Sequence, residues 1–140
     1  MTALGDFTAG NVLLASDLNA IGTWTSWNAN FRAQSGAYTS TSTDYSEYVQ
    51  INKLVIGRAF FRILDRTGGS SSAEFDLPVT ANAQYGNGHA IGTGRENFWS
   101  GDALSVFNFN SDEAHIRFYN NGDPSNNNYH FGIVFAYEAA

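Results

Sequence analysis

From about residue 27 onward, apolar and polar side chains alternate with a period of two, which predicts β-strands with one buried face. The clearest half-buried strand is 73–79, where Phe75 and Leu77 alternate with acidic residues. Segment 129–137 is expected to be a core strand, because every second position is aromatic or apolar: Tyr129, Phe131, Ile133, Phe135 and Tyr137. Further strands are expected near residues 27–31, 48–51, 54–64, 89–91, 103–109 and 114–119.

Segment 54–64 is the longest strand signal, and both of its faces are apolar. The odd positions hold Val55, Gly57, Ala59, Phe61 and Ile63, and the even positions hold Leu54, Ile56, Arg58, Phe60, Arg62 and Leu64. An outer strand of a monomeric sandwich should have one face in contact with water. The second face is therefore expected to be covered by a neighbouring subunit, and we predict a subunit interface at Ile56, Arg58, Phe60 and Arg62.

About eight short strands, separated by turns rich in Gly, Ser and Asn, predict an all-β domain over residues 23–140. An antiparallel sandwich and a barrel both fit the pattern. We favour an antiparallel β-sandwich of the jelly-roll type, because eight strands fill two packed sheets. The expected loops are 34–46, 65–72 and 120–128.

Residues 1–22 precede this domain and are expected to form an N-terminal arm. Ser16 can cap a single helical turn over residues 17–21, with Gly22 ending it. One turn is too short to be stable alone. A frayed terminus is the alternative, but the arm is too apolar for a solvated tail, so we expect it to dock on another surface.

Charge and composition exclude several classes of function. The chain has 140 residues, a net charge of −6 with only seven Lys and Arg, and no cysteine. Few cations argue against binding to nucleic acid or to anionic lipid. The lack of cysteine excludes disulfides and thiolate metal sites, and it fits folding in a reducing cytoplasm. No membrane-spanning run or secretory signal is visible.

Motifs for catalysis are weak. Gly92-Thr93-Gly94 lacks the third glycine and the Lys-Ser/Thr of a phosphate loop, so we interpret it as a turn. The histidines are isolated; His115 and His130 fall opposite the inward positions of their strands, which favours packing at the surface or at an interface over zinc binding. No pair of carboxylates stands out for glycoside hydrolysis. We expect no enzyme activity, no metal and no cofactor.

Four segments together resemble a family of bacteriophage virion surface proteins. They are Phe-Thr-Ala-Gly-Asn-Val-Leu-Leu-Ala-Ser-Asp-Leu-Asn at 7–19, Tyr-Val-Gln-Ile-Asn-Lys-Leu-Val at 48–55, Ser-Ala-Glu-Phe-Asp-Leu-Pro-Val-Thr-Ala at 72–81, and Tyr-Glu-Ala at 137–139. Asn52 stands where these proteins usually have Gly, and Asn also tolerates a left-handed backbone. A Trp-x-x-Gly-Asp motif that is common near the end of such proteins is missing.

The resemblance implies a non-enzymatic structural protein on the virion: a capsid decoration protein, a head fibre or the tip of a minor tail protein. Many such proteins are homotrimers. The short chain favours a trimeric decoration (cement) protein, assembled in the host cytoplasm, whose arm binds the major capsid protein. The expected capsid contacts are the apolar arm residues Phe7, Val12, Leu13, Leu14, Leu18 and Ile21.

The alternative is a receptor-binding domain of a tail fibre or minor tail protein that recognises glycans on the host surface. Aromatic side chains that could stack on sugar rings are Trp24, Trp99, Tyr38 and Tyr45. For Trp24 the competing interpretation is packing against the arm, and Trp27 is expected in the core.

Overall fold

The computed structural model describes residues 22–70, 72–82, 88–98, 100–118 and 128–140. In this part of the chain the regular structure consists of strands. They are β1 (Thr25–Ser26), β2 (Arg32–Ala33), β3 (Ser40–Ile51), β4 (Leu54–Asp65), β5 (Ser72–Asp76), β6 (Ala90–Glu96), β7 (Ala103–Asn108), β8 (Glu113–Phe118) and β9 (Tyr129–Glu138). The arm residues, including the helical turn predicted over 17–21, lie outside the described residues.

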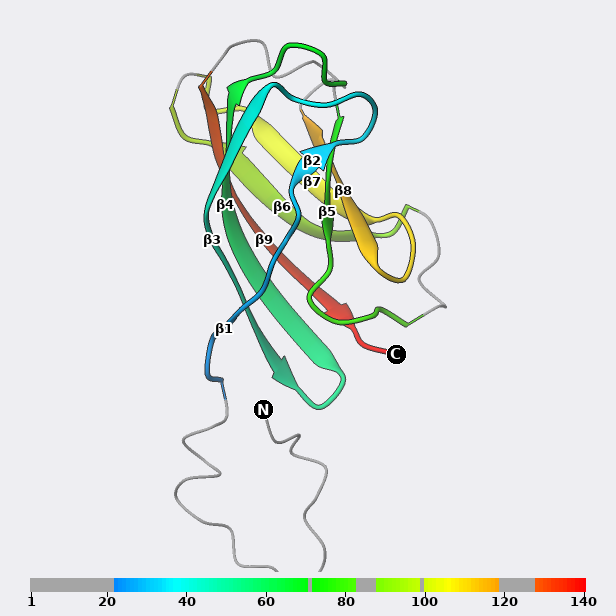
Figure 1. Cartoon of the computed structure of the whole chain (residues 1–140). Helices are drawn as coiled ribbons and strands as arrows, with labels where there is room; N and C mark the ends of the chain where they lie inside the picture. Colours follow the sequence, from blue (N-terminus) through cyan, green and yellow to red (C-terminus); the bar gives the residue numbers. More distant parts are fainter. Residues whose placement is uncertain (1–21, 71, 83–87, 99, 119–127) are drawn as a thin grey trace, which may run out of the picture.

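The strands form one antiparallel sheet in the order β1-β3-β4-β9-β6-β7-β8-β5-β2, curled into a half-barrel around the core (Figure 1). The all-β antiparallel class is therefore confirmed. The jelly-roll sandwich is not confirmed, because hydrogen bonding runs unbroken from β1 to β2 instead of dividing the strands between two sheets.

A two-stranded ribbon accounts for the curl of the sheet. β3 pairs with β4, and the segments that leave this hairpin stay paired: the Gln34 amide donates to the Ser72 carbonyl (2.9 Å) and the Ala37 amide to the Gly68 carbonyl (3.2 Å). The ribbon continues into the β2–β5 pair. Phe31, just before β2, stacks on Phe61 of β4 with ring centres 4.4 Å apart. The ribbon thus folds the two ends of the sheet over one core.

The core lines the inner face of the curl. The odd positions of β4 and β9 are buried as predicted, and so are Ala73, Phe75 and Leu77. Phe75 of β5 packs across the core on Phe135 of β9, with ring centres 5.4 Å apart. Inward alternation in the sequence therefore located the core correctly.

Two predicted loops are strands in the structure. β3 begins at Ser40, inside the expected loop 34–46, and the expected turn Gly92-Thr93-Gly94 lies in the middle of β6. The interpretation of these residues as a turn is wrong, and the glycine at position 92 has a steric role in the strand instead. A Cβ at Gly92 would lie 2.2 Å from the Val134 carbonyl oxygen, so the glycine is required for the close approach of β9.

The predicted strand 27–31 is instead the connection between β1 and β2. Its inward residues are assigned correctly, since Ala29 and Phe31 are buried and Trp27 packs against the core. The Trp27 indole also donates a hydrogen bond to the Asp76 carbonyl (2.9 Å). At the β3–β4 turn, Asn52 has φ 52°, the left-handed backbone expected there.

Candidate interaction surface

The outer face of β3, β4 and β9 includes the even positions of β4, which the sequence pattern predicts to be covered by a neighbouring subunit. Antiparallel register aligns Val49, Ile56 and Ala136 in one row and Glu47, Arg58 and Val134 in the next. Directly paired residues in an antiparallel sheet project from the same face. The even positions of β4 are thus joined to outward positions of two neighbouring strands.

Five large apolar or aromatic side chains on this face are exposed, and we call them the outer apolar patch: Trp24, Tyr45, Leu54, Ile56 and Val134. Their exposed fractions run from 36% for Ile56 to 56% for Val134. Single exposed apolar residues are normal on protein surfaces. Five on one face, on and beside three adjoining strands, concentrate apolar surface there, which is typical of a binding face.

Arg58 lies within the patch but its charge is balanced. Its Nε and Nη2 donate to Glu47 Oε2 (3.1 and 2.8 Å), and its guanidinium carbon lies 4.2 Å from the Trp24 ring centre and 5.8 Å from that of Tyr45. Arg62 pairs in the same way with Asp44. Exposed pairs of this kind contribute about 0–1 kcal/mol to stability. Their main effect here is to leave the face close to electrically neutral.

The structure therefore brings together residues predicted for two different roles. Ile56, Arg58, Phe60 and Arg62, predicted at a subunit interface, lie on one face of β4 with Trp24 and Tyr45, which were predicted to stack on sugars. Val134 was not among the predicted site residues. Its even position in β9, opposite the core ladder, was the signal that marked it as outward.

The other predicted site residues lie elsewhere. Tyr38 stacks on Phe31 with ring centres 6.1 Å apart, and its hydroxyl donates to the Ser70 carbonyl (3.1 Å), so one face of its ring packs internally. Trp99 and the six arm residues predicted to contact a capsid lie outside the described residues.

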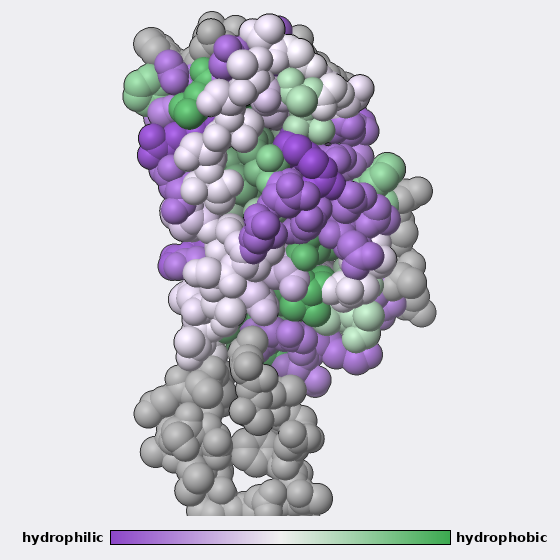
Figure 2. Space-filling view, viewed as in Figure 1, coloured by the Kyte–Doolittle hydropathy of each residue, from purple (hydrophilic) through white to green (hydrophobic). Residues whose placement is uncertain are grey.

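A separate cluster of charged side chains joins β2, the last strand of the sheet, to β5 and β8. Arg32 of β2 contacts Glu74 (2.6 Å) and Asp76 (2.7 Å) of β5 and Glu113 of β8 (2.6 Å). Figure 2 shows hydrophilic residues crossing the viewed face in the region of these strands. Because one guanidinium bonds three carboxylates, the cluster acts as a clamp on the last strand of the sheet.

His115 lies next to this clamp. Its surroundings differ from the packing at the surface or at an interface that the sequence predicts. It is on the outer side of β8, as expected, but it is only 2% exposed and needs no second subunit for cover. Phe109 stacks on its ring with centres 4.2 Å apart, and Phe107 meets it edge-on at 5.6 Å. Its Nε2 lies 3.3 Å from Glu74 Oε2 without hydrogen-bond alignment.

Burial lowers the pKa of His115, because the site disfavours the charged imidazolium; Glu74 and Glu113 oppose this shift and Arg117 adds to it. The unfolded chain therefore takes up a proton that the folded chain resists. We expect the contribution of His115 to the free energy of unfolding to be constant above the ordinary histidine pKa of 6.5 and to decrease as the pH falls below it.

Urea unfolding at a series of pH values between about 7.5 and 5 tests this expectation. In His115→Gln the loss of stability just below pH 6.5 should be reduced, since no imidazole remains to be protonated. An identical pH dependence in the variant and the parent protein would show that His115 is not the source.

Glu96 is a fully buried carboxylate that holds the β6–β7 loop. Its oxygens accept hydrogen bonds from the backbone amides of Phe98 (2.7 Å), Ser100 (2.6 Å) and Gly101 (2.9 Å). Glu96 was not among the predicted site residues, because an acidic residue at the end of a strand does not by itself indicate such a role. Three amide donors explain how a carboxylate is stable in this position.

Glu96→Gln is expected to lower the free energy of unfolding by about 2–3 kcal/mol, because an amide nitrogen replaces one oxygen that accepts from the backbone. Denaturant unfolding measures the loss. Asp112→Asn, at an exposed carboxylate, is the matched control and should cost less than about 1 kcal/mol. Equal losses in the two variants would contradict a special role for the buried carboxylate.

Among the described residues, no group of three or more His, Cys, Asp or Glu side chains is arranged to hold a metal ion. That same part of the chain also has no helix long and apolar enough to cross a membrane. No family model, curated protein or solved structure matches this chain. The outer apolar patch therefore has to be interpreted from its own residues.

Proposed function

We propose that this chain is a non-enzymatic structural protein of a bacteriophage particle, most simply a homotrimeric decoration protein on the outer surface of the capsid. The ordered motifs at 7–19, 48–55, 72–81 and 137–139 support the assignment to the virion. In this proposal the curled sheet takes the place of the jelly roll expected from the sequence.

The observation that carries the proposal is the outer apolar patch. Ile56 and Val134 lie diagonally across the neighbouring strands β4 and β9 in the interior of the sheet, where outward residues of a lone subunit are usually polar. Contact with other copies would remove this surface from water, at about 25 cal/mol for each Å² buried. The neutral pairing of Arg58 with Glu47 is compatible with such a contact, because no unpaired charge has to be buried.

Three copies would also place three arms on one particle site. Each arm carries the six apolar residues predicted to contact the capsid, and linked arms bind far more tightly than single ones because the second and third attach at high effective concentration. A protein held in this way could bridge neighbouring capsid subunits. Cementing them would oppose expansion of the shell by the pressure of packaged DNA.

Deletion of residues 2–20 tests the role of the arm. The shortened chain is expected to keep its oligomeric state and to lose binding to shells of the phage that encodes it, measured by co-sedimentation. A full-length variant with the six apolar arm residues changed to serine separates apolarity from length, and it should also fail to bind. Normal decoration by either variant would contradict the arm hypothesis.

The second candidate is a receptor-binding domain on the phage tail. It is favoured by the aromatic residues Trp24 and Tyr45, which are 41% and 43% exposed and whose rings both lie close to the same guanidinium, that of Arg58. Labelling the protein on whole particles distinguishes the candidates, since a signal over the head supports decoration and one confined to the tail supports receptor binding.

A further inference from the structure

A hollow of about 440 Å³ lies beside the β6–β7 loop, and none of its lining residues belongs to the outer apolar patch. It is lined by Arg95, Glu96, Asn97, Phe98, Ser100 and Gly101. Ligand pockets usually occupy ~300–1,000 Å³, so the space suits a small ligand. Phe98 is 56% exposed at this site, so a large part of its ring is available to contact a ligand.

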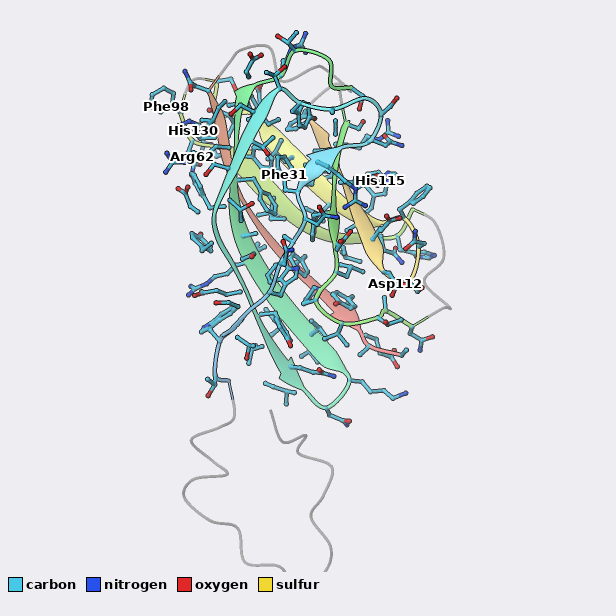
Figure 3. All side chains as sticks on the ribbon, viewed as in Figure 1. Phe31, Arg62, Phe98, Asp112, His115 and His130 are labelled. Carbon is cyan, nitrogen blue, oxygen red and sulfur yellow. The ribbon has the colours of Figure 1, made fainter. Side chains whose placement is uncertain are left out.

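The position of the Phe98 ring is fixed by its surroundings. It packs on His130 of β9 with ring centres 4.8 Å apart and planes 33° apart, while the neighbouring Asn97 amide donates to the His130 carbonyl (2.8 Å). Figure 3 shows Phe98, His130 and Arg62 together on one side of the sheet, at the end away from the β3–β4 turn. A ring held in this way loses little freedom when it binds a ligand.

The polar groups of the hollow are also preorganised. The Glu96 carboxylate fixes the loop through backbone amides, and Arg95 Nε donates to the Gly101 carbonyl (3.2 Å). A Cβ on Gly101 would approach an Arg95 guanidinium nitrogen to 3.0 Å, so the glycine lets the side chain lie close across the loop. An aromatic face therefore stands beside a guanidinium, a carboxamide and a hydroxyl.

We propose that this hollow binds a neutral pyranose sugar, with one face of the sugar ring on Phe98 and its hydroxyls on Arg95 and Asn97. The C–H groups of a pyranose are attracted to the negative face of an aromatic ring, and its hydroxyls both donate and accept hydrogen bonds. A neutral sugar fits better than an acidic one, since the Glu96 and Asp102 carboxylates already outnumber the Arg95 charge in this loop.

The sugar site does not depend on the proposed virion function. Arg62, the register partner of His130, is six residues along β4 from Ile56, or about 20 Å in an extended strand, whereas Tyr45 of the patch pairs with Phe60, two residues from Arg62. Binding at the hollow and self-association through the patch are tested with different variants, Phe98→Ala and Ile56→Asp, and can therefore succeed or fail separately. Together they would give one subunit a face for its own copies and a site for a surface polysaccharide.

The test is an amide NMR titration of the deuterated full-length protein with neutral methyl pyranosides. The probes are the methyl glycosides of glucose, galactose, mannose, rhamnose, N-acetylglucosamine and N-acetylgalactosamine, with methyl glucuronide as the acidic comparison. Saturable shifts at Asn97, Gly101 and His130 with at least one neutral probe are expected. Absence of saturable shifts with all six, or saturation with the glucuronide alone, overturns the proposal.

Two substitutions locate the binding. Phe98→Ala should weaken it at least tenfold, whereas Phe98→Tyr should retain it because the ring face is kept. Phe109→Ala is the matched control, since Phe109 is also an exposed phenylalanine stacked on a histidine but is not among the residues lining the hollow. Unchanged binding by a folded Phe98→Ala protein, or equal losses in Phe98→Ala and Phe109→Ala, would overturn the assignment to this hollow.

Discussion

Phe61→Ala is expected to lower the free energy of unfolding by about 3–5 kcal/mol, the largest loss we predict for any single substitution. Phe61 is fully buried, and its ring centre lies 4.4 Å from that of Phe31, 5.8 Å from Phe75 and 5.9 Å from Phe131. These rings belong to four separate parts of the curled sheet. Truncation would leave a cavity at the point where the two ends of the sheet meet.

Urea unfolding of Phe61→Ala and Phe60→Ala measures this effect. Phe60 is the adjacent residue of β4, projects from the outer face and is only half-buried, so its loss should be less than half as large. Domains of this size are typically stable by about 5–15 kcal/mol, and Phe61→Ala should therefore bring the chain close to unfolding at raised temperature. Similar losses in the two variants would contradict the inward and outward assignment of β4.

Ile56→Asp is expected to have the second large effect, which is dissociation of the proposed oligomer without unfolding of the subunit. Ile56 is 36% exposed in the single chain, so a carboxylate there remains hydrated while the subunit is alone. In an oligomer the same carboxylate would be buried against apolar side chains without a partner, at a cost of several kcal/mol. We expect the dissociation constant to rise at least 100-fold.

Sedimentation of the Ile56→Asp protein over a range of concentrations measures the change. Ser105→Asp is the matched control, because Ser105 is also exposed on the outer side but lies on β7, two strands beyond β9. It should leave the oligomer intact. Dissociation by both variants would point to general charge repulsion instead of a defined interface at β4.

The sequence was sufficient to locate the core strands because their side chains alternate strongly. β4 and β9 agree closely with the predicted segments, and their inward residues are the buried ones. The strand predicted at 48–51 was too short, because Ser40–Glu47 is polar except for Tyr45 and becomes part of β3 through its backbone pairing with β4. Such long-range pairing is not encoded in local alternation.

The outer apolar patch could be predicted only in part. The two apolar faces of 54–64 identified Ile56, but the contribution of Val134 required the register between β4 and β9. The burial of His115 was not predicted, because Phe109, which stacks on it, lies beyond the end of β7. The curling of the sheet into a half-barrel could not be predicted from the sequence either, since it depends on the pairing of segments 34–37 and 68–72.

Self-association through the outer apolar patch is the central claim, and the mass of the full-length protein in solution tests it most directly. Native mass spectrometry and light scattering should give three times the 15.2 kDa of one chain at micromolar concentration. A mass of one chain at every concentration, from a folded and soluble protein, would contradict the claim.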